Sequence, residues 1–127
     1  MQLIHCEILT NNLLSFEVSF VYGHNELKKR RRLRDDLDRV AQCSKPWIFL
    51  GDWNTVLSSD DRLSNFLFKC RDAEAFKDCL LRNDLEVLPT VGLKYTWYNQ
   101  QSPPYHMWAA LDRIMAIVNG GTWFLLE

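Results

Sequence analysis

The sequence predicts an α/β fold in which helices pack over a sheet. Strand-type segments of alternating or continuous apolar residues recur along the chain, and two amphipathic helical patterns separate them. Hydrophobic residues make up 47% of the 127 residues and aromatic residues 13%, which indicates an ordered globular domain rather than a disordered segment. The pattern fits three layers as well as four. The length fits one domain or part of one, residues 1–127.

The first third of the chain predicts a strand hairpin followed by a helix. Residues 3–8 form a short β-type run, and residues 16–22 alternate so that aromatic and β-branched side chains share one face. Asn25 is the expected N-cap of the helix. The helix should end near residues 42–44, because Pro46 disfavours helical geometry at the residue before it.

The rest of the chain alternates between strand-type and helical patterns. The continuous apolar run 47–50 predicts a strand that is buried on both faces. A polar loop is expected over 58–71, and Asp72 is the expected cap of a second helix. This helix should bury three residues: Phe76, Cys79 and Leu80. Three further strand-type segments follow: 85–88, 95–98 and 111–118.

The most informative tetrad is Gly51-Asp52-Trp53-Asn54, directly after the apolar run. In extended geometry Asp52 and Asn54 point the same way, whereas Trp53 turns into the core. Attack on a phosphodiester needs a group that orients water and neutral donors for the phosphate oxygens, and an aspartate with an asparagine supplies both. The alternative is a turn in which both side chains bond only local backbone.

Three segments, taken in order, resemble the motifs of the endonuclease/exonuclease/phosphatase superfamily. "SFVYGHN" resembles a strand ending in Y-x-P-N, "PWIFLGDWN" resembles a strand followed by G-D-F-N, and "GLKYTWYN" with "ALDRI" resembles Y-T-W followed by S-R-L-D-R-I. The resemblance covers residues 2 to about 118 and is especially close to the endonuclease domains of plant LINE-type non-LTR retrotransposons. It implies a partial four-layer α/β sandwich and a Mg²⁺-dependent endonuclease that acts on DNA.

The resemblance also implies a role for each matched residue. Asp52 would activate or position the water, and Asn54 would hold the scissile phosphate. Tyr22 aligns with the family's active-site tyrosine and would donate to a phosphate oxygen, and Asn25 aligns with the family's asparagine three residues on, as a further candidate catalytic residue. Asp112 would orient a histidine that lies further along the chain. We expect these residues to meet at one rim of the fold, at the ends of central strands.

Two groups on which the family's chemistry depends have no match in this sequence. The metal-binding glutamate belongs to strands upstream of the matched segments, and the S-D-H motif lies downstream of them. Ala109 and Ala110 stand where the family has serine and arginine. Since Mg²⁺ is held by one or two carboxylates plus water and substrate, loss of the main carboxylate predicts very weak binding, and no metal ligand is assigned.

This departure predicts an endonuclease-derived domain that is partial at both ends and inactive as it stands. A non-catalytic remnant and a phosphatase of the same fold are the alternatives. The sheet is expected to be incomplete, so that the strand over residues 3–8 or 47–50 lacks a neighbour.

Six of the seven residues 28–34 are basic, although the net charge of the chain is −1. At a helix start these cations oppose the macrodipole, which favours contact with phosphates. The alternative is a solvated face in which Asp35, Asp36 and Asp38 pair with the arginines four residues earlier. Arg30 falls within the apolar arc of this helix and is expected to pair or to extend its head group to solvent there.

The remaining features carry weaker predictions. Trp97 can stack on a base or sugar of a substrate, and a core position is the alternative. His24 is interpreted as an exposed loop residue. The four cysteines lack CxxC spacing, which favours reduced thiols of an intracellular protein. No signal peptide and no apolar run of the ~20 residues needed to cross a membrane is found, and no specific protein partner is inferred.

Overall fold

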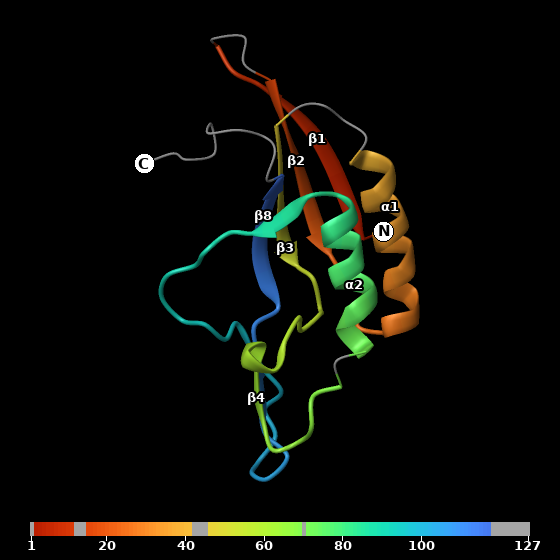
Figure 1. Cartoon of the computed structure of the whole chain (residues 1–127). Helices are drawn as coiled ribbons and strands as arrows, with labels where there is room; N and C mark the ends of the chain where they lie inside the picture. The colour runs from red at the N-terminus through yellow and green to blue at the C-terminus, as the bar shows by residue number, and fades with distance from the viewer. Residues whose placement is uncertain (1, 12–14, 42–45, 70, 118–127) are drawn as a thin grey trace.

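The computed structural model describes residues 2–11, 15–41, 46–69 and 71–117 (Figure 1). They form a five-stranded sheet in the order β1-β2-β3-β8-β5 and a three-stranded sheet in the order β4-β7-β6. The strands are β1 Leu3–Leu9, β2 Ser15–Tyr22, β3 Trp47–Asp52, β4 Arg62–Ser64, β5 Leu85–Val87, β6 Trp97–Tyr98, β7 Met107–Ala109 and β8 Asp112–Ile117. The helices are η1 Leu27–Arg30, α1 Arg31–Val40, η2 Ser59–Asp61 and α2 Arg71–Arg82.

A β-hairpin and a βαβ unit form one half of the larger sheet. β1 pairs with β2 in antiparallel register, which confirms the predicted hairpin. β2 and β3 are parallel neighbours, so the chain crosses between them through η1 and α1. On its other side β3 pairs with β8, which in turn pairs with β5. β3 is therefore central, and the prediction that residues 47–50 lack a neighbour is wrong.

β1, by contrast, is an edge strand in the part of the chain that the structure describes. Its pairing there is with β2 alone. The prediction of an exposed edge at residues 3–8 is thus confirmed for the described residues.

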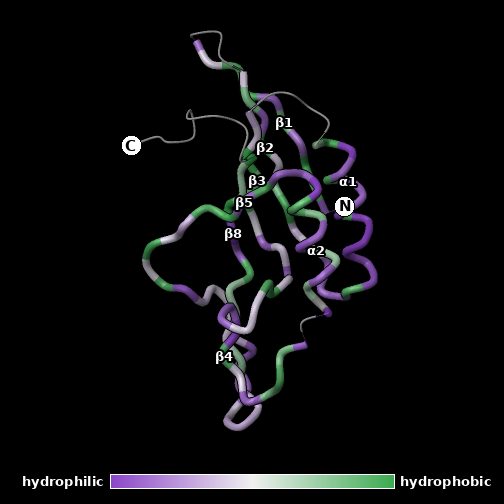
Figure 2. Tube along the Cα trace, viewed as in Figure 1, coloured by the Kyte–Doolittle hydropathy of each residue, from purple (hydrophilic) through white to green (hydrophobic). Residues whose placement is uncertain are grey.

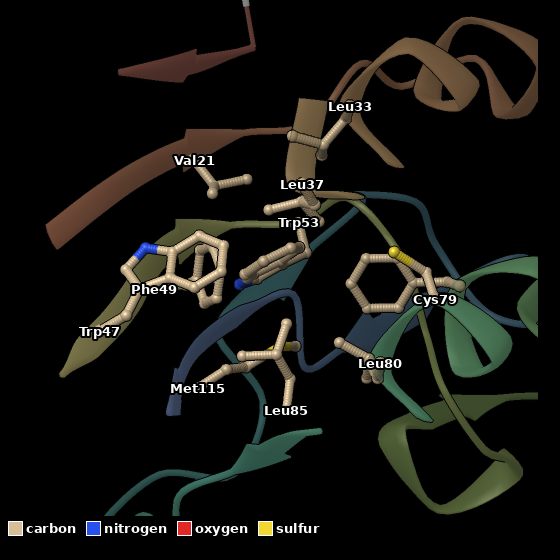
Figure 3. Close-up of a cluster of buried hydrophobic side chains, with 11 residues drawn as sticks. Val21, Leu33, Leu37, Trp47, Phe49, Trp53, Cys79, Leu80, Leu85 and Met115 are labelled. Atoms are coloured by element: carbon tan, nitrogen blue, oxygen red, sulfur yellow. The ribbon is translucent and has the colours of Figure 1, made fainter. Parts of the chain in front are cut away.

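Both helices pack on the same face of the larger sheet, which we call the covered face (Figure 1). Strand residues on this face, among them Trp47, Phe49 and Met115, are fully buried. Trp53 belongs to this core, since its ring contacts Phe49 (Figure 3) and also Phe76 of α2. As predicted, Trp53 turns inward, and α2 buries Phe76, Cys79 and Leu80.

The opposite face of the sheet, the open face, carries apolar side chains that remain in solvent. Ile4, Phe20 and Ile114 are 54%, 47% and 42% exposed. Leu50 of β3 is partly buried, so the predicted burial of this strand on both faces is met only on the covered face. A sheet that is apolar on both faces is typical of folds in which both faces are covered. The described residues supply a helical layer on one face only.

The first helical segment begins later than the sequence predicts. Asn25 is not its N-cap: the segment starts as the 3₁₀ turn η1 after Glu26, and no side chain caps η1 or α1. The His24 ring Nδ1 accepts the amide of Glu26, the residue before η1, at 3.0 Å. Cations in the first turn oppose the helix dipole, and a 3₁₀ start is common at helix N-termini.

The smaller sheet was not predicted as a unit. The expected polar loop 58–71 contains η2 and β4, and β7 was missed. Strands of two or three residues are too short to show a period of two. Their pairing depends instead on partners distant in sequence, such as the stacked rings of Tyr98 and Trp108, whose centroids are 4.3 Å apart. α2 begins at Arg71, so Asp72 lies within the helix and is not its N-terminal cap.

No helix among the described residues is both long and apolar enough to cross a membrane.

Candidate functional site

Three of the predicted site residues stand in one row across the centre of the larger sheet. Tyr22 is the register partner of Asp52, and Asp52 is the register partner of Asp112. Because neighbouring strands lie about 4.8 Å apart, the row spans roughly 10 Å from Tyr22 to Asp112. Directly opposed residues project to the same side of a sheet, so the three side chains share the open face. Tyr22 is 67% exposed, and Asp112 is exposed as well.

The ends of these three strands are tied together by backbone hydrogen bonds. The Gly23 amide donates to the Asp52 carbonyl at 2.8 Å, and the Trp53 amide donates to the Leu111 carbonyl at 2.9 Å. Gly23 lies so close to β3 that a Cβ atom there would stand 2.5 Å from the Trp53 carbonyl oxygen. The row therefore belongs to one tightly joined rim.

Gly51 is the second position of the rim that needs glycine. Its φ of +142° lies in a region that L side chains rarely adopt, and a Cβ atom would overlap the Val21 carbonyl. The glycine of the G-D-W-N tetrad thus lets β3 bend and still deliver Asp52 to the rim.

Asn54 joins the rim in a different way from the one predicted. Its φ is +48°, so the backbone leaves extended geometry, and the rule that places residues 52 and 54 on one face does not apply. Its Nδ2 donates to the Gly23 carbonyl, and its own amide donates to Asp52 Oδ1 at 2.8 Å. Asn54 Nδ2 carries two hydrogens, so one donor remains for another partner.

The electrostatic setting of Asp52 follows from its position. Burial raises the pKa of Asp52 above its usual value of 3.8, the hydrogen bond from the Asn54 amide opposes this, and the nearby Asp112 carboxylate raises the pKa further. Arg113 has a smaller, opposing influence on this pKa. A raised carboxylate pKa beside a strand end is typical of functional sites. It marks Asp52 as the residue of the row with the most perturbed charge.

Arg30 is a positioning residue that the sequence did not reveal as part of the site. Its guanidinium donates to the carbonyls of His24, Asn25 and Asn54, at 3.0, 3.2 and 2.6 Å. It therefore joins the loop after β2 to the loop after β3. The sequence did indicate that Arg30 is a cation within the apolar arc of the helix. The prediction that it finds partners there is confirmed, and these partners are backbone carbonyls.

Asn25 reaches the rim through its backbone. Its carbonyl accepts from Arg30, and its side chain is exposed beside the open pocket described below. His24 is half-buried rather than exposed, since its amide donates to Gln2 Oε1 at 2.8 Å and its ring accepts from Glu26. The interpretation of His24 as an exposed loop residue is wrong.

Arg113 supports the rim from the covered side. It is 7% exposed and donates to the carbonyls of Thr55 and Ala110 and, at 3.0 Å, to the Asp61 carboxylate. Burial lowers the pKa of Arg113, and Asp61 opposes this shift. The contacts fasten the segment after Asn54 to the start of β8, next to Asp112.

Trp97 lies in solvent near the same rim. It is 42% exposed, so the alternative that placed it in the core is wrong. Its neighbour Thr96 accepts the amides of Leu111 and Asp112 at 3.1 and 3.2 Å. Trp97 is thus one residue from the backbone that positions Asp112.

The donor set for a metal ion is small. The described residues contain no group of three or more His, Cys, Asp or Glu side chains that could hold one. Asp52 and Asp112 are the two carboxylates of the row, and Asp61 is engaged by Arg113. Asp52 and Asp112 are thus the carboxylates of the row that could contribute to holding a metal ion.

No family model and no curated protein match the chain. Among solved structures, the endonuclease domain of TRAS1, a telomere-specific non-LTR retrotransposon, aligns with a TM-score of 0.70 and 16% sequence identity. The two chains share a fold. The alignment covers 93% of this chain and 51% of that one, so the present chain spans about half the length of the endonuclease domain. The predicted α/β class is confirmed, whereas the four-layer arrangement stays a prediction.

Proposed function

We propose that the chain is half of a DNA endonuclease-like phosphodiesterase domain of the endonuclease/exonuclease/phosphatase type, derived from a non-LTR retrotransposon. The observation that carries the proposal is the row Tyr22, Asp52 and Asp112 on neighbouring strands. The three motifs are far apart in the sequence, and each supplies one member of the row. The similarity in fold to a retrotransposon endonuclease domain supports the same origin.

The chemistry assigned to the row is the binding and orientation of a phosphodiester. The Tyr22 hydroxyl is exposed and can donate to a phosphate oxygen, as can the remaining Asn54 amide hydrogen. Asp52 accepts a hydrogen bond on Oδ1, which leaves Oδ2 to orient a water molecule. Asp112 is the partner for a positively charged or proton-sharing group from the remainder of the domain.

We further propose that the chain alone does not cleave DNA. Mg²⁺, when bound to a complete domain of this type, would stabilise the charge on the phosphate. The family's metal-binding glutamate has no match in the sequence, and loss of one preorganised group alone typically costs ~10²–10³ in rate. In a complete domain, a second sheet would cover the open face and finish the four layers.

A supercoiled-plasmid nicking assay, run with and without Mg²⁺, tests this function. The expected result is that the wild-type chain retards the plasmid in a gel but leaves it supercoiled, as does Asp52→Asn. Metal-dependent nicking by the wild type that disappears in Asp52→Asn, but not in the exposed control Glu86→Gln, would contradict the proposed inactivity. Absence of any DNA binding would contradict the proposed substrate.

A further inference from the structure

Two adjoining pockets beside the rim are lined with cations. The larger, of about 900 Å³, extends from Tyr22 and Asn25 to Lys28, Lys29, Arg31 and Arg32. The smaller, of about 430 Å³, lies between the two helices and is lined by Lys28, Arg31, Arg34 and Arg71 together with Leu27 and Ala75. Because Lys28 and Arg31 line both pockets, the two form one continuous surface. We call its six cations the basic track: Lys28, Lys29, Arg31, Arg32, Arg34 and Arg71.

Two of the three aspartates expected to neutralise this surface are engaged by other residues. Asp36 pairs with Arg39 at 2.9 Å, and Asp38 pairs with Arg82 and accepts from Asn83, on α2 and just after it. Among the described residues, Lys28, Arg31, Arg32 and Arg34 form no ion pair with any of the three aspartates. The sequence-based alternative of a self-paired face is therefore wrong for these arginines. Figure 2 shows α1 as hydrophilic along most of its length.

Two acids do remain near the larger pocket. Asp35 and Asp36 line it, and Lys29 is paired with Glu26 at 2.8 Å. Among the side chains that the structure describes, none in the lining of the smaller pocket is acidic. The two acids therefore lie beside the larger pocket, whereas Lys28 and Arg31 line both pockets.

The basic track and its unpaired cations adjoin the rim. A short loop and η1 connect β2 to α1, and Tyr22 lines the larger pocket together with Arg31 and Arg32 of the first turn of α1. Its ten residues span about 15 Å, a length over which each strand of a DNA duplex carries about four phosphates. Keeping four cations unpaired in the first turns of a helix opposes its dipole, and anionic phosphates would relieve this cost.

We propose that the basic track binds the phosphate backbone of a nucleic acid duplex and leads it across the rim at Tyr22 and Asp52. This rests on the proposed function, because it assigns the track to the same substrate as the row. Backbone phosphates carry no sequence information, so the track binds without sequence preference.

Fluorescence anisotropy with a labelled 20-base-pair duplex at 50 and 200 mM salt tests the proposal on the full 127-residue chain. Lys28→Gln/Arg31→Gln removes the two cations shared by both pockets. Lys77→Gln/Lys94→Gln removes the same charge from exposed positions away from the track. The track variant should bind at least tenfold more weakly at 50 mM salt, with a salt slope lower by about 1.8, which corresponds to two phosphate contacts. The control should bind within twofold of the wild type.

A third variant separates charge from side-chain identity. Lys28→Arg/Arg31→Lys keeps both charges and should retain wild-type affinity. If the track and control variants lose duplex affinity equally, or if neither loses any, the basic track is not the binding surface. The proposed function would still stand in that case, provided that the wild type binds the duplex. Absence of duplex binding in every variant would instead count against both proposals. Binding only to anionic phosphatidylserine vesicles would overturn the assignment to nucleic acid.

Discussion

The two faces of the larger sheet are built by the same strands but differ in what covers them. Phe49 on the covered face is fully buried, whereas Phe20, on the neighbouring strand, projects to the open face and is 47% exposed. The helices of the described chain complete one core only. The row of Tyr22, Asp52 and Asp112 lies at the end of the open face. Stability therefore depends mainly on one face and the candidate chemistry on the other, and substitutions should separate the two.

A pair of phenylalanine substitutions gives the sharpest contrast between the faces. Phe49→Ala should lower the free energy of unfolding by about 3–5 kcal/mol, because it opens a cavity beside Trp47 and Trp53. Phe20→Ala should cost about 1 kcal/mol or less, since its ring is already half in solvent. Urea unfolding followed by tryptophan fluorescence measures both. Equal losses would contradict the view that the open face lacks a covering layer.

Arg113→Met should cost about 3 kcal/mol, because it leaves Asp61 and two carbonyls without their buried donor. The matched control is Arg82→Met, which removes an exposed ion pair with Asp38 and should cost much less stability than Arg113→Met, because solvent screens the pair. Chemical denaturation of the two variants side by side checks the difference. If Arg113→Met loses no more stability than the control, the hydrogen bonds of Arg113 do not support the rim.

Gly23→Ala tests how tightly the rim is closed. A Cβ atom would meet the Trp53 carbonyl, which is backbone and cannot rotate away, so the variant should lose about 1–3 kcal/mol. Thermal unfolding measures the loss. A variant as stable as the wild type would mean that the ends of β2 and β3 are further apart than the structure has them.

The smallest expected effect concerns the charge of Asp52. Its pKa is raised in the folded state, mainly by burial, so the folded chain binds a proton more tightly than the unfolded chain. The Asp52 contribution to stability therefore falls as pH rises from about the ordinary value of 3.8 through the raised folded value. Asp52→Asn should gain stability relative to the wild type across this window. Urea unfolding of both proteins at pH 4 and pH 7 tests the sign. If the stability of Asp52→Asn relative to the wild type does not rise between pH 4 and pH 7, the prediction is wrong.

Much of the fold could be predicted from patterns of apolar residues. The hairpin, both helices and β3 each have a period or a continuous run long enough to recognise, and Trp53 was placed correctly in the core. The smaller sheet was missed because its strands, such as Met107–Ala109, are too short to show a period. The start of the first helix was misplaced because the segment begins as a 3₁₀ turn after Glu26, without the side-chain cap expected from Asn25.

The row itself was foreseeable because its residues lie in three recognisable motifs. The contacts that position the row could not be predicted from the sequence. Arg30 donates to the Asn54 carbonyl and Arg113 to the Thr55 carbonyl, which both lie far away in the sequence. No local sequence pattern identifies such partners. Asn54 likewise has a positive φ, and its side chain donates to Gly23, a residue distant in sequence that follows β2. Tertiary contacts, rather than local propensity, decide these features.

The most direct test of the account is where a duplex binds on the chain. In ¹⁵N-labelled protein, titration with a short DNA duplex should shift the amides of Gly23, Asp52, Asn54 and Asp112 most strongly. The amides of Cys79 and Leu80, in the covered core, should remain in place. Shifts confined to β6 and β7, or spread evenly over the chain, would contradict a phosphodiester site at the end of the open face.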